Sequence, residues 1–91
     1  MAIVSLRPTG PAAYAVDVDD GARTVRLSVT VPPGFAASVG WPDDAAAALV
    51  EASIAFLLAR EPAPAILPRF TLAQITGYFP EYPDEMRRHR P

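Results

Sequence analysis

The sequence predicts an α+β domain in which a small antiparallel sheet of two or three strands is packed by one long helix. Three observations predict this class. Residues 23–31 alternate apolar and polar side chains, as a strand with one buried face does. Residues 42–61 have the start and stop signals of a helix, and six of the eleven prolines fall after residue 60. We therefore expect one domain over residues 1–91, with the sheet in 3–41, the long helix in 42–61, proline-rich turns and a short helix in 62–83, and a frayed tail in 84–91.

Composition limits the classes of function. The chain has 91 residues, 51% of them hydrophobic, and a formal charge of −2, which gives no general attraction to phosphate backbones. It has no cysteine, so disulfides and cysteine-based zinc sites are excluded. The longest nearly apolar run, residues 45–59, is shorter than the roughly 20 residues of a membrane span. The N-terminus does not resemble a secretory signal. These features predict a cytoplasmic protein without membrane contact.

A hairpin and one further strand candidate are predicted in the first 31 residues. Residues 3–7 form a short strand candidate that Pro8 ends, and Tyr14–Val18 alternates clearly. The turn chemistry of residues 19–22 (DDGA) then joins Tyr14–Val18 to the strand in 23–31 as a hairpin. Residues 35–41 alternate again and are candidates for a third sheet strand or an extended edge segment.

The long helix carries two apolar stripes. Pro42 suits its first position, with Asp43 as a competing N-cap, and Arg60 and Pro62 mark its end. At 100° per residue the first stripe consists of Val50, Ile54, Leu57 and Leu58, and the second of Ala45, Leu49 and Phe56. A small sheet covers one stripe, so the second needs another cover.

The C-terminal region predicts a short helix over residues 72–79. Thr71 and Gln74 have the spacing of a capping box, and Pro80 ends the helix. Residues 65–70 are expected to form a turn or short helix that places Ile66, Leu67 and Phe70 against the core. We expect the 72–79 helix to cover the second stripe, in its own chain or in a partner. The candidate interface residues are Ala45, Leu49, Phe56, Ile75, Phe79 and Tyr82.

No motif for catalysis or for a cofactor is complete. Asp17, Asp19 and Asp20 resemble the start of a calcium loop. Gly21, however, stands where that loop needs an oxygen ligand, and Ser28 where it needs a bidentate Glu, so a hairpin turn is predicted instead. His89, the only histidine, lies in the expected tail. Glu51 faces outward at its helical angle. We therefore predict no catalytic residue, no metal and no cofactor.

The strings VEASIAFLLAREP and ILPRFTLAQITGYFPEY, which span Val50–Tyr82, resemble a group of short uncharacterised prokaryotic proteins. That group shares a helix ending in FLLxREP and a downstream ILxxFxL…YFPEY. The resemblance implies no activity and no site residue. A looser similarity, of layout only, is to HicB-type antitoxins, which place a long helix after a small antiparallel sheet.

The function expected from the sequence is that of a small non-enzymatic protein that binds another protein or itself. A homodimer through the second stripe is one form that such a protein can take. The alternative is a DNA-binding or antitoxin-like regulator that uses residues 71–90, with Arg87, Arg88 and Arg90 as candidate phosphate contacts. Ala73 and Gly77 have helix-turn-helix spacing, but Pro80 and Pro83 are expected to damage the recognition helix, and the net charge disfavours nucleic acid.

Overall fold

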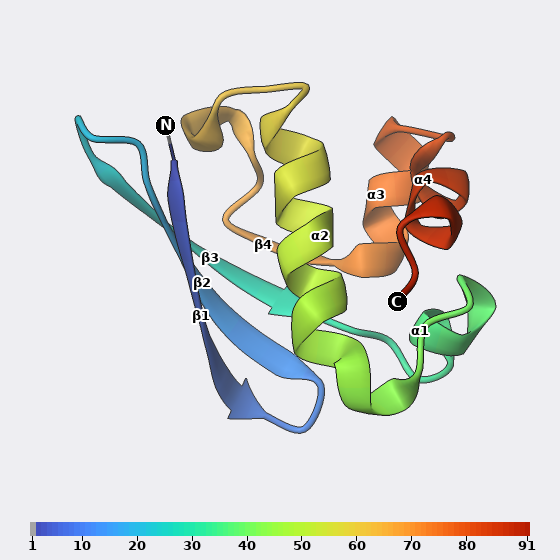
Figure 1. Ribbon diagram of the computed structural model, residues 1–91. Coiled ribbons are helices and arrows are strands. Elements are labelled where there is room, and N and C mark those ends of the chain that lie inside the picture. Colours follow the sequence, from blue (N-terminus) through green and yellow to red (C-terminus); the bar gives the residue numbers. More distant parts are fainter. Residues whose placement is uncertain (1) are drawn as a thin grey trace.

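The computed structural model describes residues 2–91 and has an α+β architecture with a four-stranded mixed sheet. The strands are β1 (Ile3–Gly10), β2 (Ala13–Asp19), β3 (Thr24–Thr30) and β4 (Arg69–Thr71), in the order β1-β2-β3-β4. The first three pair antiparallel, and β4 pairs parallel to β3. Figure 1 shows α2 (Ala46–Leu58) lying across one face of this sheet, with α3 (Leu72–Tyr78) and α4 (Tyr82–Arg88) on the far side of α2.

The predicted hairpin is present, because its turn supplies its own hydrogen bonds. The amide of Gly21 donates to Asp19 Oδ1, and the amides of Ala22 and Arg23 donate to Asp20 Oδ1, each at 2.9 Å. The bonds from the Arg23 and Ala22 amides hold the pKa of Asp20 below its ordinary value. On the two strands of this hairpin, Val16, Val18, Leu27 and Val29 are buried, as the alternation predicts.

Two predictions about the sheet are wrong. Residues 35–41 form no third strand: Phe35–Ser38 is the short helix α1, which begins after Gly34 at a φ of 79°. Alanine favours a helix over a strand, and Ser38 Oγ donates back to the Phe35 carbonyl at 2.6 Å. The expected antiparallel sheet of two or three strands is instead a mixed sheet of four, because β4 pairs parallel to β3. β4 begins where the Ser28 amide donates to the Pro68 carbonyl at 2.8 Å.

Pro8 does not end β1, which continues to Gly10. A proline fits within an edge strand when the position of its missing N–H faces solvent. The strand order places β1 at an edge of the sheet.

The long helix is shorter than predicted and has a different start. Pro42 is extended (ψ 150°) and lies outside the helix, a 3-10 turn spans Asp43–Ala45, and α2 begins at Ala46. At the other end the amides of Arg60 and Glu61 both reach the Leu57 carbonyl, which tightens the last turn before Pro62.

The C-terminal region is more ordered than the sequence predicts. The capping box of Thr71 and Gln74 is present and starts α3. A 3-10 turn (Ala63–Ala65) buries Ala63, and Ile66 and Phe70 are buried as expected, but Leu67 is not. The predicted frayed tail is the helix α4 up to Arg88. Pro83 lies in its first turn, where a missing N–H costs nothing, so the expectation that this proline damages the helix is wrong.

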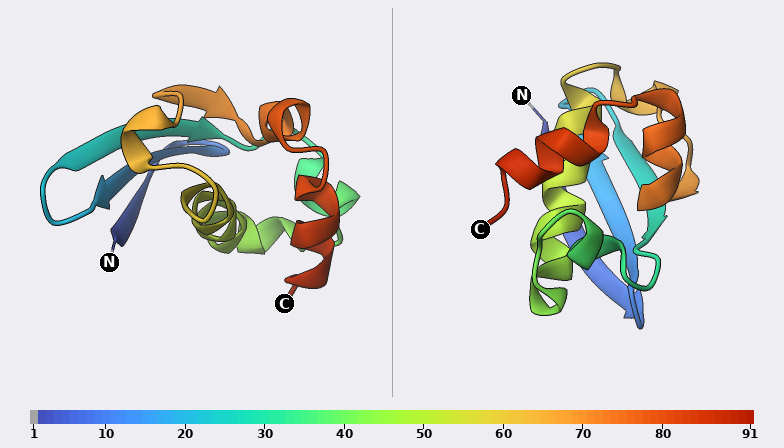
Figure 2. Two further views of the ribbon diagram at one scale, coloured as in Figure 1. Left: turned by 90° about the horizontal axis from the view of Figure 1, so that it is seen from above. Right: turned by 90° about the vertical axis from the view of Figure 1, so that its right-hand side faces the viewer.

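A buried polar network joins α4 to the rest of the core. Trp41 Nε1 donates to the Met86 carbonyl at 2.7 Å. The Ser53 hydroxyl lies 2.7 Å from the Leu49 carbonyl and 2.6 Å from the Tyr82 hydroxyl. All these groups are buried, and burial raises the pKa of Tyr82 to about 12. The right-hand view of Figure 2 shows α4 crossing near α2 as a result.

Candidate functional site

The second stripe of α2 is covered by the chain's own C-terminal helices. The Phe56 ring packs edge-on against Phe79, with centroids 5.8 Å apart, and against Tyr82 at 5.2 Å. Tyr82 also stacks on Phe35 at 6.0 Å. Four of the six candidate interface residues are therefore buried in this core and two are half-buried; the buried ones are Leu49, Phe56, Ile75 and Tyr82, and the half-buried ones are Ala45 and Phe79.

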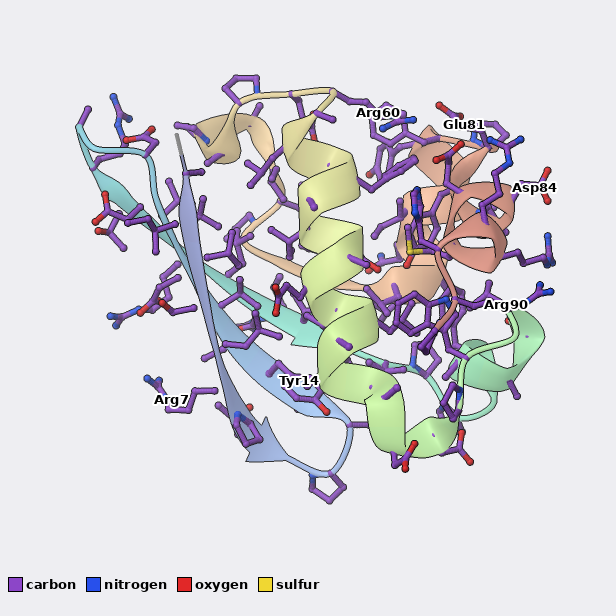
Figure 3. All side chains as sticks on the ribbon, viewed as in Figure 1. Arg7, Tyr14, Arg60, Glu81, Asp84 and Arg90 are labelled. Carbon is purple, nitrogen blue, oxygen red and sulfur yellow. The ribbon has the colours of Figure 1, made fainter. Side chains whose placement is uncertain are left out.

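The covering is reinforced by Arg60 just after α2. Its guanidinium lies 3.6 Å from the centroid of the Phe56 ring and donates to Glu81 Oε2 at 3.3 Å (Figure 3). It also donates to the Phe56 carbonyl at 3.0 Å, one of the unpaired carbonyls at the end of the helix. Arg60 thus holds the segment after α3 onto the stripe.

An apolar groove lies between the C-terminal end of α2 and α3. It has a volume of about 290 Å³. Its lining is apolar except for one amide, one carboxylate and one phenol hydroxyl, and consists of Leu57, Glu61, Ala65, Ile66, Leu67, Phe70, Gln74, Ile75, Tyr78 and Phe79. We refer to this set as the apolar groove.

Three elements shape this groove. The tight end of α2 and Pro62 turn the chain away, so that Ala65–Leu67 forms one wall. β4 places the buried Phe70 beside it, and the capped start of α3 sets the direction in which Ile75 and Tyr78 project. Gln74 Oε1 is already engaged by the Thr71 amide at 2.7 Å.

Large exposed apolar side chains mark the rim of the groove. The chain has three such residues among those described: Ile3, Leu67 and Tyr78. Leu67 (45% exposed) and Tyr78 (67%) both line the groove. Most surface apolar residues are scattered singly, so two at one concave site make the groove a candidate binding surface.

Glu61 is the one charged residue of the groove. It is half-buried and forms no ion pair with any described residue, while the neighbouring Arg60 is paired with Glu81. The groove therefore carries an uncompensated negative charge at its margin.

A second hollow, of about 390 Å³, lies between α2 and α4. Its charged residues already have partners within the chain: Arg60 pairs with Glu81, and Glu85 pairs with Arg88 and with His89 at 3.5 Å. It has no large exposed apolar side chain, so the apolar groove is the better candidate for a partner.

The candidate phosphate contacts are engaged within the chain. Arg87 pairs with Asp84 at 2.7 Å, and Arg88 with Glu85. The Arg90 side chain lies over Gly40, where a Cβ would approach its Cδ to 3.2 Å, and its Nη1 donates to the Arg87 carbonyl at 3.4 Å. Figure 3 shows Arg90 beside α1. These bonds reduce the positive charge that α4 offers to a phosphate.

The remaining sequence candidates are solvent-exposed or engaged in local bonds. Glu51 is exposed on α2, as predicted. The oxygens of Asp19 and Asp20 bind the amides of their own turn. Within residues 2–91 no three His, Asp or Glu side chains are grouped to hold a metal, and no helix there is both long and apolar enough to cross a membrane.

Comparisons with protein-family models, with curated proteins and with solved structures found no match to this chain. The resemblance of Val50–Tyr82 to short uncharacterised prokaryotic proteins stays a prediction.

Proposed function

We propose that this protein is a small interaction module whose apolar groove takes an apolar side chain of another protein, flanked by a basic residue. The observation that carries the proposal is the pair of exposed side chains, Leu67 and Tyr78, at the rim of a concave apolar surface. Aromatic and apolar anchors that fill such hollows supply most of the energy of protein interfaces.

The size of the groove favours a side chain over a cofactor. Sites for small molecules commonly measure about 300–1,000 Å³ and enclose most of their ligand. The groove, at about 290 Å³, is at the lower end of that range. It offers one free carboxylate and no cluster of polar groups that would orient a polar ligand. An amphipathic segment that inserts one or two anchors fits it better.

The negative charge of Glu61 favours a partner with a positive charge. The carboxylate has no cation of its own, so an Arg or Lys next to the apolar anchor would compensate it. A partner that carries an acid there would be disfavoured by like-charge repulsion.

A library of displayed random peptides, selected on the full chain, tests the proposal. We expect enrichment of sequences that combine a Leu, Phe or Trp anchor with Arg or Lys. Binding of these peptides should fall at least about tenfold, or about 1.4 kcal/mol, with Tyr78→Asp or Leu67→Asp.

The matched control is Ile3→Asp, the same change at the third large exposed apolar side chain, which lies on β1 and outside the groove. It should leave peptide binding unchanged. Enriched peptides that bind the Tyr78→Asp and Leu67→Asp variants as tightly as the original chain would remove the proposal, as would a failure to enrich any peptide.

A further inference from the structure

The outer edge of β1 is unpaired along its length. β1 is eight residues long and is hydrogen-bonded only to β2, whereas the opposite edge strand, β4, has three residues. Figure 1 shows β1 at the border of the sheet, with no other element beside its outer edge. Long unpaired edges are templates for another strand, and most proteins cover or interrupt them.

The register shows which backbone groups this edge offers. The Val31 amide donates to the Ala12 carbonyl at 2.8 Å, and these residues are opposite in the β2–β3 register. Because bonded and non-bonded pairs alternate in an antiparallel ladder, Ala13, Ala15 and Asp17 direct their backbone groups toward β1.

Opposite Ala15 and Asp17 stand Arg7 and Ser5, which therefore use their backbone groups within the sheet. Val4, Leu6 and Pro8 direct theirs outward. The donation from the Ser28 amide to Pro68, away from β2, agrees with this alternation. Pro8 falls at an outward position, where its missing N–H breaks no bond of the sheet.

The side chains at this edge are incompletely buried. Val4 and Leu6 lie on the core side and are half-buried, although their partners Val18 and Val16 are fully buried. Ile3, on the other face, is 65% exposed. One further strand would cover Val4 and Leu6 with apolar neighbours.

We propose that β1 docks on β1 of a second copy of this chain, antiparallel about a two-fold axis at Ser5, and joins the two sheets into one. In this register Val4 pairs with Leu6 of the second copy, and every outward N–H and C=O of these two residues is satisfied. A register centred on Leu6 would instead place Pro8, which has no N–H, opposite the Val4 carbonyl inside the strand. In the register centred on Ser5, Pro8 meets Ala2, which lies before the start of β1.

The face of the sheet that carries Ile3, Ser5 and Arg7 fits the same register. Ser5 meets Ser5 of the second copy, and Arg7 meets Ile3, so no like charges stand opposite one another. The exposed face of α2, the helix that contacts β1, consists of the small Ala47, Ala48 and Ala55, with Glu51 as its only charge. These small side chains leave room for the second copy above the joined sheet.

Cysteine cross-linking tests the contact, because the natural chain has no cysteine. In the proposed register the two Ser5 Cα atoms form a non-hydrogen-bonded pair about 4.5 Å apart, within the range of a disulfide. The two Arg7 residues are four positions out of register, about 13 Å apart at 3.3 Å per residue, which is too far for a disulfide. Ser5→Cys should therefore form a linked dimer on mild oxidation, and Arg7→Cys should not.

Two further measurements complete the test. A mixture of Ile3→Cys and Arg7→Cys chains should link to each other, and sedimentation should give twice the chain mass for the original protein. Tyr78→Asp, in the apolar groove, should leave that mass unchanged. A result that contradicts this dimer therefore does not contradict the proposed function, and the reverse also holds. A monomer by sedimentation, or equal linking of Ser5→Cys and Arg7→Cys, would overturn the proposal.

Discussion

Ser53 is the only buried polar residue of the described core, and its hydroxyl joins α2 to α4. It contacts the Leu49 carbonyl, the Tyr82 hydroxyl and, at 3.7 Å, the Met86 sulfur. A hydroxyl in a core stabilises the fold only while its partners are satisfied, so these residues act as a unit.

Ser53→Ala should lower the free energy of unfolding by about 1–3 kcal/mol, because the Tyr82 hydroxyl loses its partner in the core. Adding Tyr82→Phe to that variant should recover part of the loss, since no unpaired hydroxyl then remains. Urea denaturation measures both. A Ser53→Ala chain as stable as the original would show that the bond contributes nothing.

Tyr82 should make the protein sensitive to alkali. Its pKa is about 12 in the folded protein against an ordinary value of 10, because burial disfavours the phenolate. The unfolded chain therefore loses this proton first as the pH rises. The contribution to stability is present below pH 10 and is lost between pH 10 and 12, by up to about 2–3 kcal/mol.

Urea unfolding of the original chain and of Tyr82→Phe at pH 9, 10 and 11 measures this loss. The original should lose more stability with pH than the variant, which lacks the buried hydroxyl. Parallel curves for the two proteins would contradict the raised pKa.

At the scale of the elements, α4 acts as the cover of α2, and Trp41 holds it there. Trp41→Phe removes the donor to the Met86 carbonyl while it keeps an aromatic ring in the core. We expect hydrogen exchange in α4 to accelerate by about fivefold or more, which corresponds to about 1 kcal/mol per lost bond. Amides in the middle of α2 should be unaffected; equal acceleration in both helices would mean that α4 does not open separately.

Elements with a local signal were predictable from the sequence. The alternation of β3, the Asp-rich turn and the capping box of Thr71 and Gln74 depend on neighbours in the chain, and all three are present. β4 has three residues and pairs parallel with a strand about forty positions away, so no local pattern predicts it. The helix α4 depends on the burial of Tyr82 and Met86 in the core and on the Trp41 bond, which are also long-range.

The candidate site was predictable only in part, for the same reason. The sequence indicates that α2 has more apolar surface than a sheet covers. Which segment covers the excess depends on how α3 and α4 return to it. Leu67 was expected in the core, but the chain between Ala65 and β4 leaves it at the rim of the apolar groove. Tyr78 had no sequence signal, because an exposed tyrosine in a short helix is common.

For the whole molecule, charge argues against nucleic acid as the partner. Arg87 and Arg88 are paired with Asp84 and Glu85, and the net charge is −2. A gel shift with duplex DNA should show no retarded band even at low salt, where phosphate contacts are strongest. A band that weakens steeply as salt is added would favour the regulator that residues 71–90 suggested.

The two proposed surfaces use different residues of the molecule. The edge of β1 would join two copies, and the apolar groove, built from Leu57, Phe70 and α3, would remain open on each. Two linked grooves would bind a partner with two anchors more tightly than either groove alone.

The charge preference of the apolar groove tests whether a partner binds there with a basic residue beside Glu61. The measurement is the affinity of one selected peptide with Arg beside its apolar anchor, and of its twin with Glu there, for the original chain and for Glu61→Arg. We predict that the original prefers the Arg peptide by about five- to tenfold and that the preference reverses in Glu61→Arg, as expected for about 1 kcal/mol of charge pairing at a half-exposed site. The same preference in both proteins would show that the partner does not bind beside Glu61, and would contradict the account.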